Sequence, residues 1–219
     1  MMQEFKGVLF DMDGVIFDSE VCVIDCWKEV AKRYGIPFIE KTAMECIGTT
    51  KSKSREIMKK EYGEDFPYDE YAQEASQIYH EKYDGGRLPM KNGVKKLLAS
   101  LEERGIRIAL ATSTRYETAV NQLRDAGILD YFDEVVTGDF VEKSKPAPDI
   151  FLKACELIEL DVKDVYVIED SYNGVRAAHA GNMRVIMVPD LLPPDDEMES
   201  KAEVILENLE EVRQYLLYV

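Results

Sequence analysis

FDMDGVIFDSE, residues 10–20, follows a short apolar run that predicts a first β-strand ending at Phe10. Asp11 and Asp13 stand at the end of this strand. Because alternate strand residues face the same way, we expect their carboxylates to lie side by side. Two acids held that close repel each other, unless a cation lies between them or one keeps its proton. Gly14 lets the backbone turn directly afterwards. An ordinary Asp- and Gly-rich turn would have the same residues, so the rest of the chain has to decide.

Composition limits the class of protein. The chain has 219 residues, 46% of them hydrophobic, which is enough for one substantial core, or for one core plus a smaller domain. Its 43 acidic and 27 basic residues give a net charge of -16, which opposes nucleic acid or an anionic membrane as a partner. No apolar run is long enough for a signal peptide or a membrane span, and we expect a cytoplasmic monomer. A protein this acidic needs local cations if it is to bind phosphate esters.

The cysteines contain no CxxC pair; they are Cys22, Cys26, Cys46 and Cys155. Cys22 and Cys26 are four residues apart and would share a helix face. We expect reduced, partly buried thiols there, the alternative being a metal pair that lacks further ligands. Neither of the two histidines follows a predicted strand, so we expect neither zinc nor histidine-based catalysis.

The chain divides into two regions that differ in their pattern of apolar residues. Residues 19–86 show helical spacing of apolar residues and no convincing strand, and Gly85 and Gly86 then suggest a hinge. From Leu88 onward helices alternate with short β-rich runs, which are residues 106–111, 134–137, 165–168 and 184–188. This alternation predicts right-handed crossovers and a parallel sheet covered on both faces. We therefore expect an α/β fold, a Rossmann-like doubly wound parallel sheet with an inserted helical segment.

Ligands of doubly wound sheets bind at the carboxyl ends of the strands, so the residues after each predicted strand are the candidates for a site. Thr112, Ser113 and Thr114 offer hydroxyls and backbone amides to an anion, although a helix N-cap is the plainer interpretation. Lys145 lies in the stiff loop KSKPAPDIF, where a solvent-exposed lysine is the alternative.

Glu169 and Asp170 follow the strand predicted at residues 165–168. Because adjacent residues point to opposite sides of a strand, we expect Asp170 to join Asp11 and Glu169 to reach the cluster less directly. The strand ends together supply several carboxylates, hydroxyl and amide donors, and one fixed positive charge. Mg²⁺ is the cation that best suits such a set, since it prefers a few carboxylates together with water and phosphate oxygens.

Four segments now resemble the motifs of the haloacid dehalogenase superfamily, and within it the beta-phosphoglucomutase-like phosphatases that carry a helical cap. In order they are DMDGVIFDSE, LATST, KSKPAPDIF and VYVIEDSYNGV, and the match runs over nearly the whole chain. The resemblance implies a catalytic core of residues 1–18 and 87–219, with residues 19–86 as the cap. It also implies a Mg²⁺-dependent phosphatase of small phosphate monoesters, with sugar phosphates as the expected class by analogy.

The resemblance assigns catalytic roles residue by residue. Asp11 would be the nucleophile that forms an aspartyl phosphate. Asp13 would be the general acid for the leaving alkoxide and then the general base for water. Thr112, with the amide of Ser113 or Thr114, would hold the phosphate oxygens.

Charge neutralisation follows from the same resemblance. Lys145 would neutralise the charge that develops on the phosphoryl group. Asp170, the Asp11 carboxylate and the Asp13 carbonyl would bind Mg²⁺, with Glu169 also near the metal.

Two positions in the cap region bear on whether the chain is a phosphatase or a mutase. Lys51, in the basic run TTKSKSR, either belongs to a solvated helix start or occupies the place where the sugar-phosphate mutases carry a phosphate-binding arginine. Those mutases also carry a histidine twelve residues after the nucleophile, where this chain has Val23. That histidine helps delay hydrolysis, so its absence favours a phosphatase. A beta-phosphoglucomutase-type mutase is the alternative, and a phosphoacceptor signalling module is a remote one.

Overall fold

The computed structural model describes residues 5–218 and divides the chain into two compact units. The core unit comprises Met1–Phe17 and Met90–Val219, and the helical unit comprises Asp18–Pro89. Within the described residues, the core unit holds a six-stranded sheet in the order β3-β2-β1-β4-β5-β6, in which all neighbouring strands are parallel. Its strands are β1 Gly7–Phe10, β2 Arg107–Thr112, β3 Glu134–Thr137, β4 Val165–Glu169, β5 Arg184–Met187 and β6 Val204–Ile205. The predicted α/β class is therefore confirmed.

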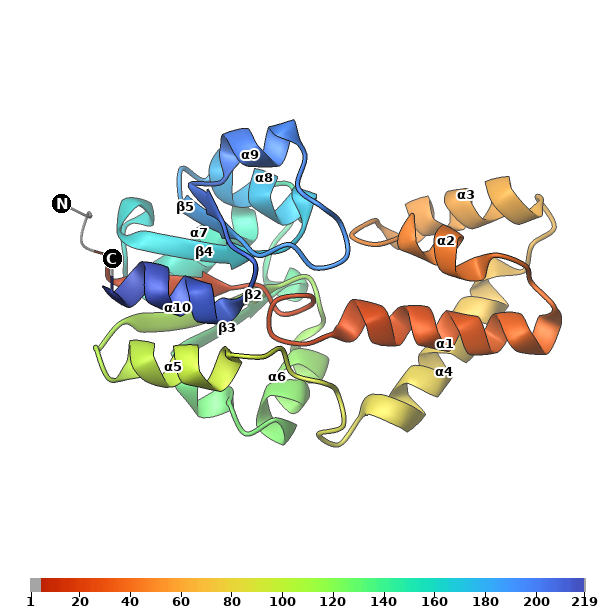
Figure 1. The fold of residues 1–219 in the computed structure, drawn as a ribbon, viewed down its shortest axis with the longest axis horizontal. Helices are drawn as coiled ribbons and strands as arrows, with labels where there is room; N and C mark the ends of the chain where they lie inside the picture. Colours follow the sequence, from red (N-terminus) through yellow and green to blue (C-terminus); the bar gives the residue numbers. More distant parts are fainter. Residues whose placement is uncertain (1–4, 219) are drawn as a thin grey trace. The chain divides into compact units, whose positions relative to one another are not determined.

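Helices cover both faces of this sheet (Figure 1). One face carries α7 and α8, with α9 packed beside α8, and the other carries α5 and α6, with α10 packed on α5. The helices of the core unit are α5 Val94–Glu102, α6 Tyr116–Asp125, α7 Asp149–Leu157, α8 Tyr172–Ala180, α9 Asp196–Lys201 and α10 Leu209–Tyr218. Short 3₁₀ turns join them at η1 Leu129–Tyr131, η2 Gly138–Phe140 and η3 Val162–Asp164.

Burial on both faces explains why β1 appears in the sequence as a continuous apolar run. All four of its residues are buried. Leu9 belongs to the cluster that includes Phe151 of α7 and Val175 of α8. Phe10 points the other way, where its ring meets that of Phe132 edge-on at 6.1 Å. A central parallel strand has no solvent face, so alternation between polar and apolar residues is absent from it.

The chain after β5 was harder to predict. The sequence predicts a strand at residues 184–188, and the structure then places two further elements, α9 and β6, between β5 and α10. β6 has two residues and lies at the edge of the sheet, so it is too short to show a periodic pattern.

The helical unit contains α1 Ser19–Tyr34, α2 Ile39–Met44, α3 Lys51–Tyr62 and α4 Tyr68–Tyr83. Aromatic stacking joins α1 to α4, with ring centroids 5.9 Å apart for Trp27 and Tyr68. Gly35 ends α1 with a φ of 67°, a left-handed conformation that glycine adopts without steric cost. Across the described part of the chain, every helix is too short or too polar to cross a membrane.

Candidate active site

The parallel strands bring the predicted site residues of the core unit to one edge of the sheet. Phe10 of β1 pairs with Leu110 of β2 on one side and with Ile168 of β4 on the other. Asp11 extends β1 by one residue, and its N–H donates to the carbonyl of Ile168 at 3.0 Å. Because the three strands run in the same direction, the segments that follow them emerge together. These segments are residues 11–13, 112–114 and 169–170.

The turn after β1 brings a third carboxylate close to the two aspartates. Met12 is fully buried between Asp11 and Asp13, and Gly14 follows with a φ of 81°. A Cβ at Gly14 would lie 2.2 Å from Oδ2 of Asp170, so the Asp170 carboxylate lies directly against this backbone. Glycine is therefore required here both for the turn and for the approach of Asp170.

Lys145 connects the two ends of the carboxylate cluster. Its Nζ donates to Oδ1 of Asp11 at 2.5 Å, to Oε1 of Glu169 at 2.7 Å and to the carbonyl of Ala111 at 3.1 Å. The same nitrogen lies 4.7 Å from the ring centroid of Phe151, and 7% of the side chain is exposed. All three donors of the ammonium are thus directed at protein acceptors. The alternative of a solvent-exposed lysine is wrong.

Glu169 is held more firmly than the sequence suggested. It is fully buried, and its Oε2 accepts from the N–H of Asp170 at 3.0 Å and from the N–H and hydroxyl of Ser171 at 2.9 and 3.0 Å. A Cβ at Gly174 would lie 1.7 Å from its Oε1. Its long side chain turns back over the start of α8 and meets Lys145, so Glu169 is linked to Asp11 through that lysine. Both oxygens of Glu169 accept hydrogen bonds from the protein, whereas the Asp170 carboxylate lies against the Gly14 turn next to Asp13, which makes Asp170 the better candidate for a metal ligand.

Burial and crowding shift the protonation equilibria of this cluster. Burial raises the pKa of Asp11 to about 8; Lys145 opposes this shift, and the charges of Glu169 and Asp13 add to it. Burial by itself would lower the pKa of Lys145, but the adjacent Asp11 and Glu169 carboxylates outweigh it and raise that pKa above its ordinary value. One ammonium faces several buried acids, so the cluster is short of positive charge.

The residues present fit a hard cation with few protein ligands. In residues 5–218, no three His, Cys, Asp or Glu side chains are grouped so that they alone could hold a metal ion. Mg²⁺ does not need such a cage, because it usually keeps several waters and binds one or two carboxylates together with substrate phosphate oxygens. Asp11 and Asp170 are 7% and 8% exposed, and both belong to the charge-deficient cluster around the Gly14 turn.

The loop after β2 is organised by its own threonines. Thr112 is fully buried, and its Oγ1 accepts from the N–H of Thr114 at 3.1 Å. The hydroxyl of Thr114 in turn donates to Oδ2 of Asp13 at 2.7 Å. The amide of Thr114 is therefore used inside the loop, and the amide of the exposed Ser113 is the better candidate for a phosphate oxygen.

The start of α6 does not use these hydroxyls as caps. Its N-cap residue is Arg115, whose side chain makes no capping hydrogen bond. The N–H of Tyr116 instead donates to Oδ2 of Asp139 in η2, at 3.1 Å. The interpretation of residues 112–114 as a helix N-cap is wrong, because η2 supplies the cap and leaves the two threonines to the β2 loop.

Lys51 belongs to the helical unit, whereas the other predicted site residues all belong to the core unit. It begins α3 behind the N-cap Thr50, and 69% of its side chain is exposed. Its Nζ lies 3.3 Å from Oδ1 of Asp69, to which Arg55 also donates at 2.8 Å. The structure thus supports a helix start in which Lys51 shares an acidic partner with Arg55.

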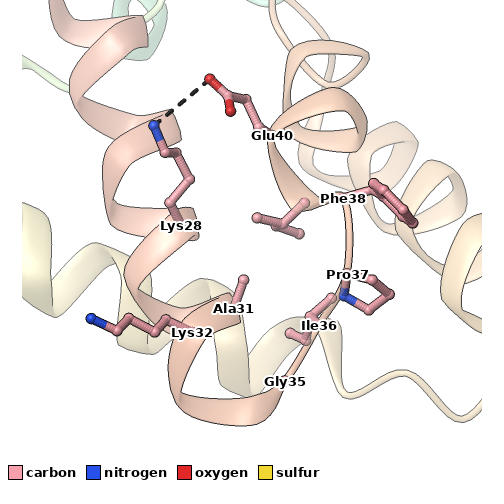
Figure 2. A pocket seen from close by; sticks show the side chains of 9 residues that line it. Lys28, Ala31, Lys32, Gly35, Ile36, Pro37, Phe38 and Glu40 are labelled. Atoms are coloured by element: carbon pink, nitrogen blue, oxygen red, sulfur yellow. Dashed lines mark ion pairs between the residues drawn. The ribbon is translucent and has the colours of Figure 1, made fainter.

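A hollow of about 350 Å³ lies elsewhere in the helical unit, between the end of α1 and the start of α2 (Figure 2). Phe38 at its rim is 81% exposed and has a left-handed φ of 56°. The Nζ of Lys28 lies 3.7 Å from Oε1 of Glu40 at the opposite wall. The hollow contains none of the predicted site residues.

Sequence reasoning assigned no role to three residues that shape the site. Ser171 donates hydrogen bonds to Glu169, and Gly174 leaves the space that the Glu169 carboxylate occupies. Asp139 accepts a hydrogen bond from the first N–H of α6. The serine three residues before a glycine after β4 was a possible indication, since Ser171 also caps α8 by accepting from the N–H of Gly174 at 3.0 Å. Nothing in the sequence near Asp139 indicates its contact with Tyr116.

The fold and the site define an α/β enzyme with a buried carboxylate–lysine cluster at the carboxyl edge of a parallel sheet. Residues 8–188 match the family described as haloacid dehalogenase-like hydrolase. The chain belongs to this family, and it is an enzyme of the phosphatase kind that the family contains.

Individual relatives cover nearly the whole chain. A phosphorylated carbohydrates phosphatase of Thermotoga maritima is 31% identical over 217 residues, covering 96% of this chain and 98% of the relative. A beta-phosphoglucomutase of Bacillus subtilis is 30% identical and covers 96% of both chains. A crystal structure from Thermotoga maritima, provisionally named a beta-phosphoglucomutase, superposes with a TM-score of 0.81 at 28% identity and covers 98% of this chain and 99% of that one.

Proposed function

We propose that this protein is a Mg²⁺-dependent phosphatase that hydrolyses small phosphate monoesters, with sugar phosphates as the substrate class, through an aspartyl phosphate on Asp11. The contact of Lys145 with Asp11, at 2.5 Å in a buried site, carries this proposal. A buried carboxylate next to a fixed cation suits a nucleophile for a phosphoryl group, since phosphoryl transfer depends mainly on positioning and charge neutralisation. The name of the Thermotoga maritima phosphatase supports the substrate class.

The proposed chemistry has two steps. In the first, a carboxylate oxygen of Asp11 attacks phosphorus, the bond from phosphorus to the ester oxygen breaks, and Asp13 gives its proton to that oxygen so that an alcohol leaves. In the second, Asp13 takes a proton from water, which attacks the aspartyl phosphate and releases inorganic phosphate and the free Asp11 carboxylate. Lys145, which contacts Asp11, would neutralise the charge on the phosphoryl oxygens in both steps.

The remaining residues of the cluster would serve binding. Asp11, Asp170 and the carbonyl of Asp13 would hold Mg²⁺, which supplies positive charge to the phosphoryl oxygens when it is bound. The backbone N–H of Ser113 would donate a hydrogen bond to a phosphate oxygen next to the buried Thr112. Glu169 would hold Lys145 in place.

Phosphatase rather than mutase activity is proposed because of Val23. This residue lies on α1 with 39% of its surface exposed, and it cannot exchange a proton as a histidine does. The Bacillus subtilis relative is named a mutase at almost the same identity as the phosphatase, so overall similarity does not separate the two reactions. Lys51 is proposed as a contact to the distal part of the substrate.

Phosphate release from a substrate panel tests the proposal. Purified protein would be assayed with sugar phosphates, nucleotides and small phosphate esters, in Mg²⁺ and in EDTA, beside Asp11→Asn. We expect release from one or a few esters, dependent on Mg²⁺ and abolished in the variant. Conversion of beta-glucose 1-phosphate to the 6-phosphate only with a bisphosphate primer would instead identify a mutase. Stable phosphorylation by acetyl phosphate without ester turnover would identify a phosphoacceptor module.

A further inference from the structure

The hydroxyl of Thr114 reaches the residue assigned as the general acid. Its Oγ1 donates to Oδ2 of Asp13 at 2.7 Å, between residues 101 positions apart in the chain. Asp13 is half-buried, so its carboxyl is only partly surrounded by water. A hydrogen bond of this length to a carboxylate is among the stronger neutral-to-charged contacts in proteins.

Thr114 is itself held in place on both sides. Its N–H donates to Oγ1 of Thr112 at 3.1 Å, and Thr112 is a fully buried residue at the end of β2. On the other side the loop packs against η2, because a Cβ at Gly138 would lie 3.2 Å from the carbonyl oxygen of Ser113. A donor fixed by a strand end and by a neighbouring turn can hold a carboxyl in one orientation.

We propose that Thr114 is a positioning residue that orients the Asp13 carboxyl for proton transfer to the leaving group, rather than a residue that binds phosphate through its amide. With Oδ2 accepting from Thr114, the proton of the acid form is on Oδ1. It passes from Oδ1 to the ester oxygen as the bond between that oxygen and phosphorus breaks. The inference rests on the proposed function, since it takes Asp13 as the general acid of a phosphatase.

Leaving-group dependence separates positioning of the acid from a purely structural role. Phenyl phosphate needs its leaving oxygen protonated, whereas p-nitrophenyl phosphate leaves as a stable anion. General acid catalysis contributes about 10²- to 10⁴-fold, so loss of orientation in Thr114→Val should lower kcat/KM for phenyl phosphate by roughly 10- to 100-fold. The loss for p-nitrophenyl phosphate should be at most about threefold. Thr114→Ser keeps a hydroxyl and should retain most of the phenyl phosphate activity.

Two further proteins complete the test. Thr118→Val makes the same substitution in the first turn of α6, just after the β2 loop, and should match the wild type with both esters. In an Asp13→Asn background, Thr114→Val should add at most a twofold loss, because the orientation of a lost acid no longer matters. Thermal unfolding followed by circular dichroism checks that each variant is folded.

Three results would overturn the proposal. Equal losses with both esters would show that Thr114 supports the loop or the phosphate, as would a full additional loss in the Asp13→Asn background. An increase in activity for Thr114→Val would show that the hydroxyl restrains the acid. These results leave the proposed function intact. Phosphate release that survives Asp11→Asn would refute the proposed function, and the positioning role with it.

Discussion

Removing the cation between Asp11 and Glu169 should destabilise the core unit strongly. Lys145→Met keeps an apolar stem against Phe151 and deletes the ammonium that lies 2.5 and 2.7 Å from the two carboxylate oxygens. At an effective dielectric constant of about 20, each of these contacts is worth roughly 6 kcal/mol before desolvation. Burying the ammonium offsets several kcal/mol of that sum, and breaking such a pair by removing one partner typically costs about 3–5 kcal/mol. We expect a loss of that size.

Thermal or urea unfolding in EDTA measures this loss without a metal ion to mask it. For a chain of this length, about 3–5 kcal/mol corresponds to a fall in Tm of roughly 6–20 °C. Lys143→Met is the matched control, because Lys143 is an exposed lysine of the same loop and should change stability by at most about 0.5 kcal/mol.

A double variant tests the physical reason for the loss. In Lys145→Met/Glu169→Gln, the Gln oxygen can still accept from the three donors that hold Oε2 of Glu169. The uncompensated charge beside Asp11 is gone, so we expect about half of the lost stability to return. A Lys145→Met protein within about 1 kcal/mol of the wild type in EDTA would refute the buried ion pair. Failure of the double variant to recover would show that the loss comes from packing.

Three further predictions concern the acid, the helical unit and the thiols. Asp13→Asn should slow alkyl and phenyl esters about 10²- to 10⁴-fold and p-nitrophenyl phosphate far less, and equal losses would contradict the acid role. Lys51→Ala should raise KM about three- to tenfold with little change in kcat, while Lys53→Ala leaves both unchanged; an unaltered KM for every substrate would exclude the distal contact. Burial raises the pKa of Cys26 and Cys155 to about 11, so iodoacetamide at pH 8 should modify them at least about a hundredfold more slowly in native than in urea-unfolded protein. Comparable rates in the two states would show that these thiols are accessible.

The order of strands and helices could be predicted from the sequence, because it depends on local patterns of apolar and polar residues. A parallel strand buried on both faces must be continuously apolar, as at residues 7–10, and the alternation of such runs with amphipathic helices permits few other folds. β6 and α9 were missed because two and six residues are too few to establish a period. The longer helices and strands could therefore be predicted, whereas the short elements near the edge of the sheet could not.

The candidate site was predictable as a set of positions. Carboxyl ends of parallel strands share one edge of the sheet, so Asp11, Thr112 and Asp170 could be grouped before any distance was known. The contact of Glu169 with Lys145 was not predictable, because face alternation describes where a side chain starts and not where its far end reaches.

The contacts that give the cluster its chemistry are properties of the folded chain alone. Lys145 and Asp11 are 134 residues apart, and Thr114 and Asp13 are 101 apart. No local pattern couples residues at such separations. Their pairing depends on strand order, on the loop that each strand end carries, and on burial that removes competing water. The types of residues and their order along the chain therefore identify a carboxylate site at the carboxyl ends of the strands. The partner of each carboxylate is decided by tertiary packing, because buried polar groups must satisfy their hydrogen bonds with one another.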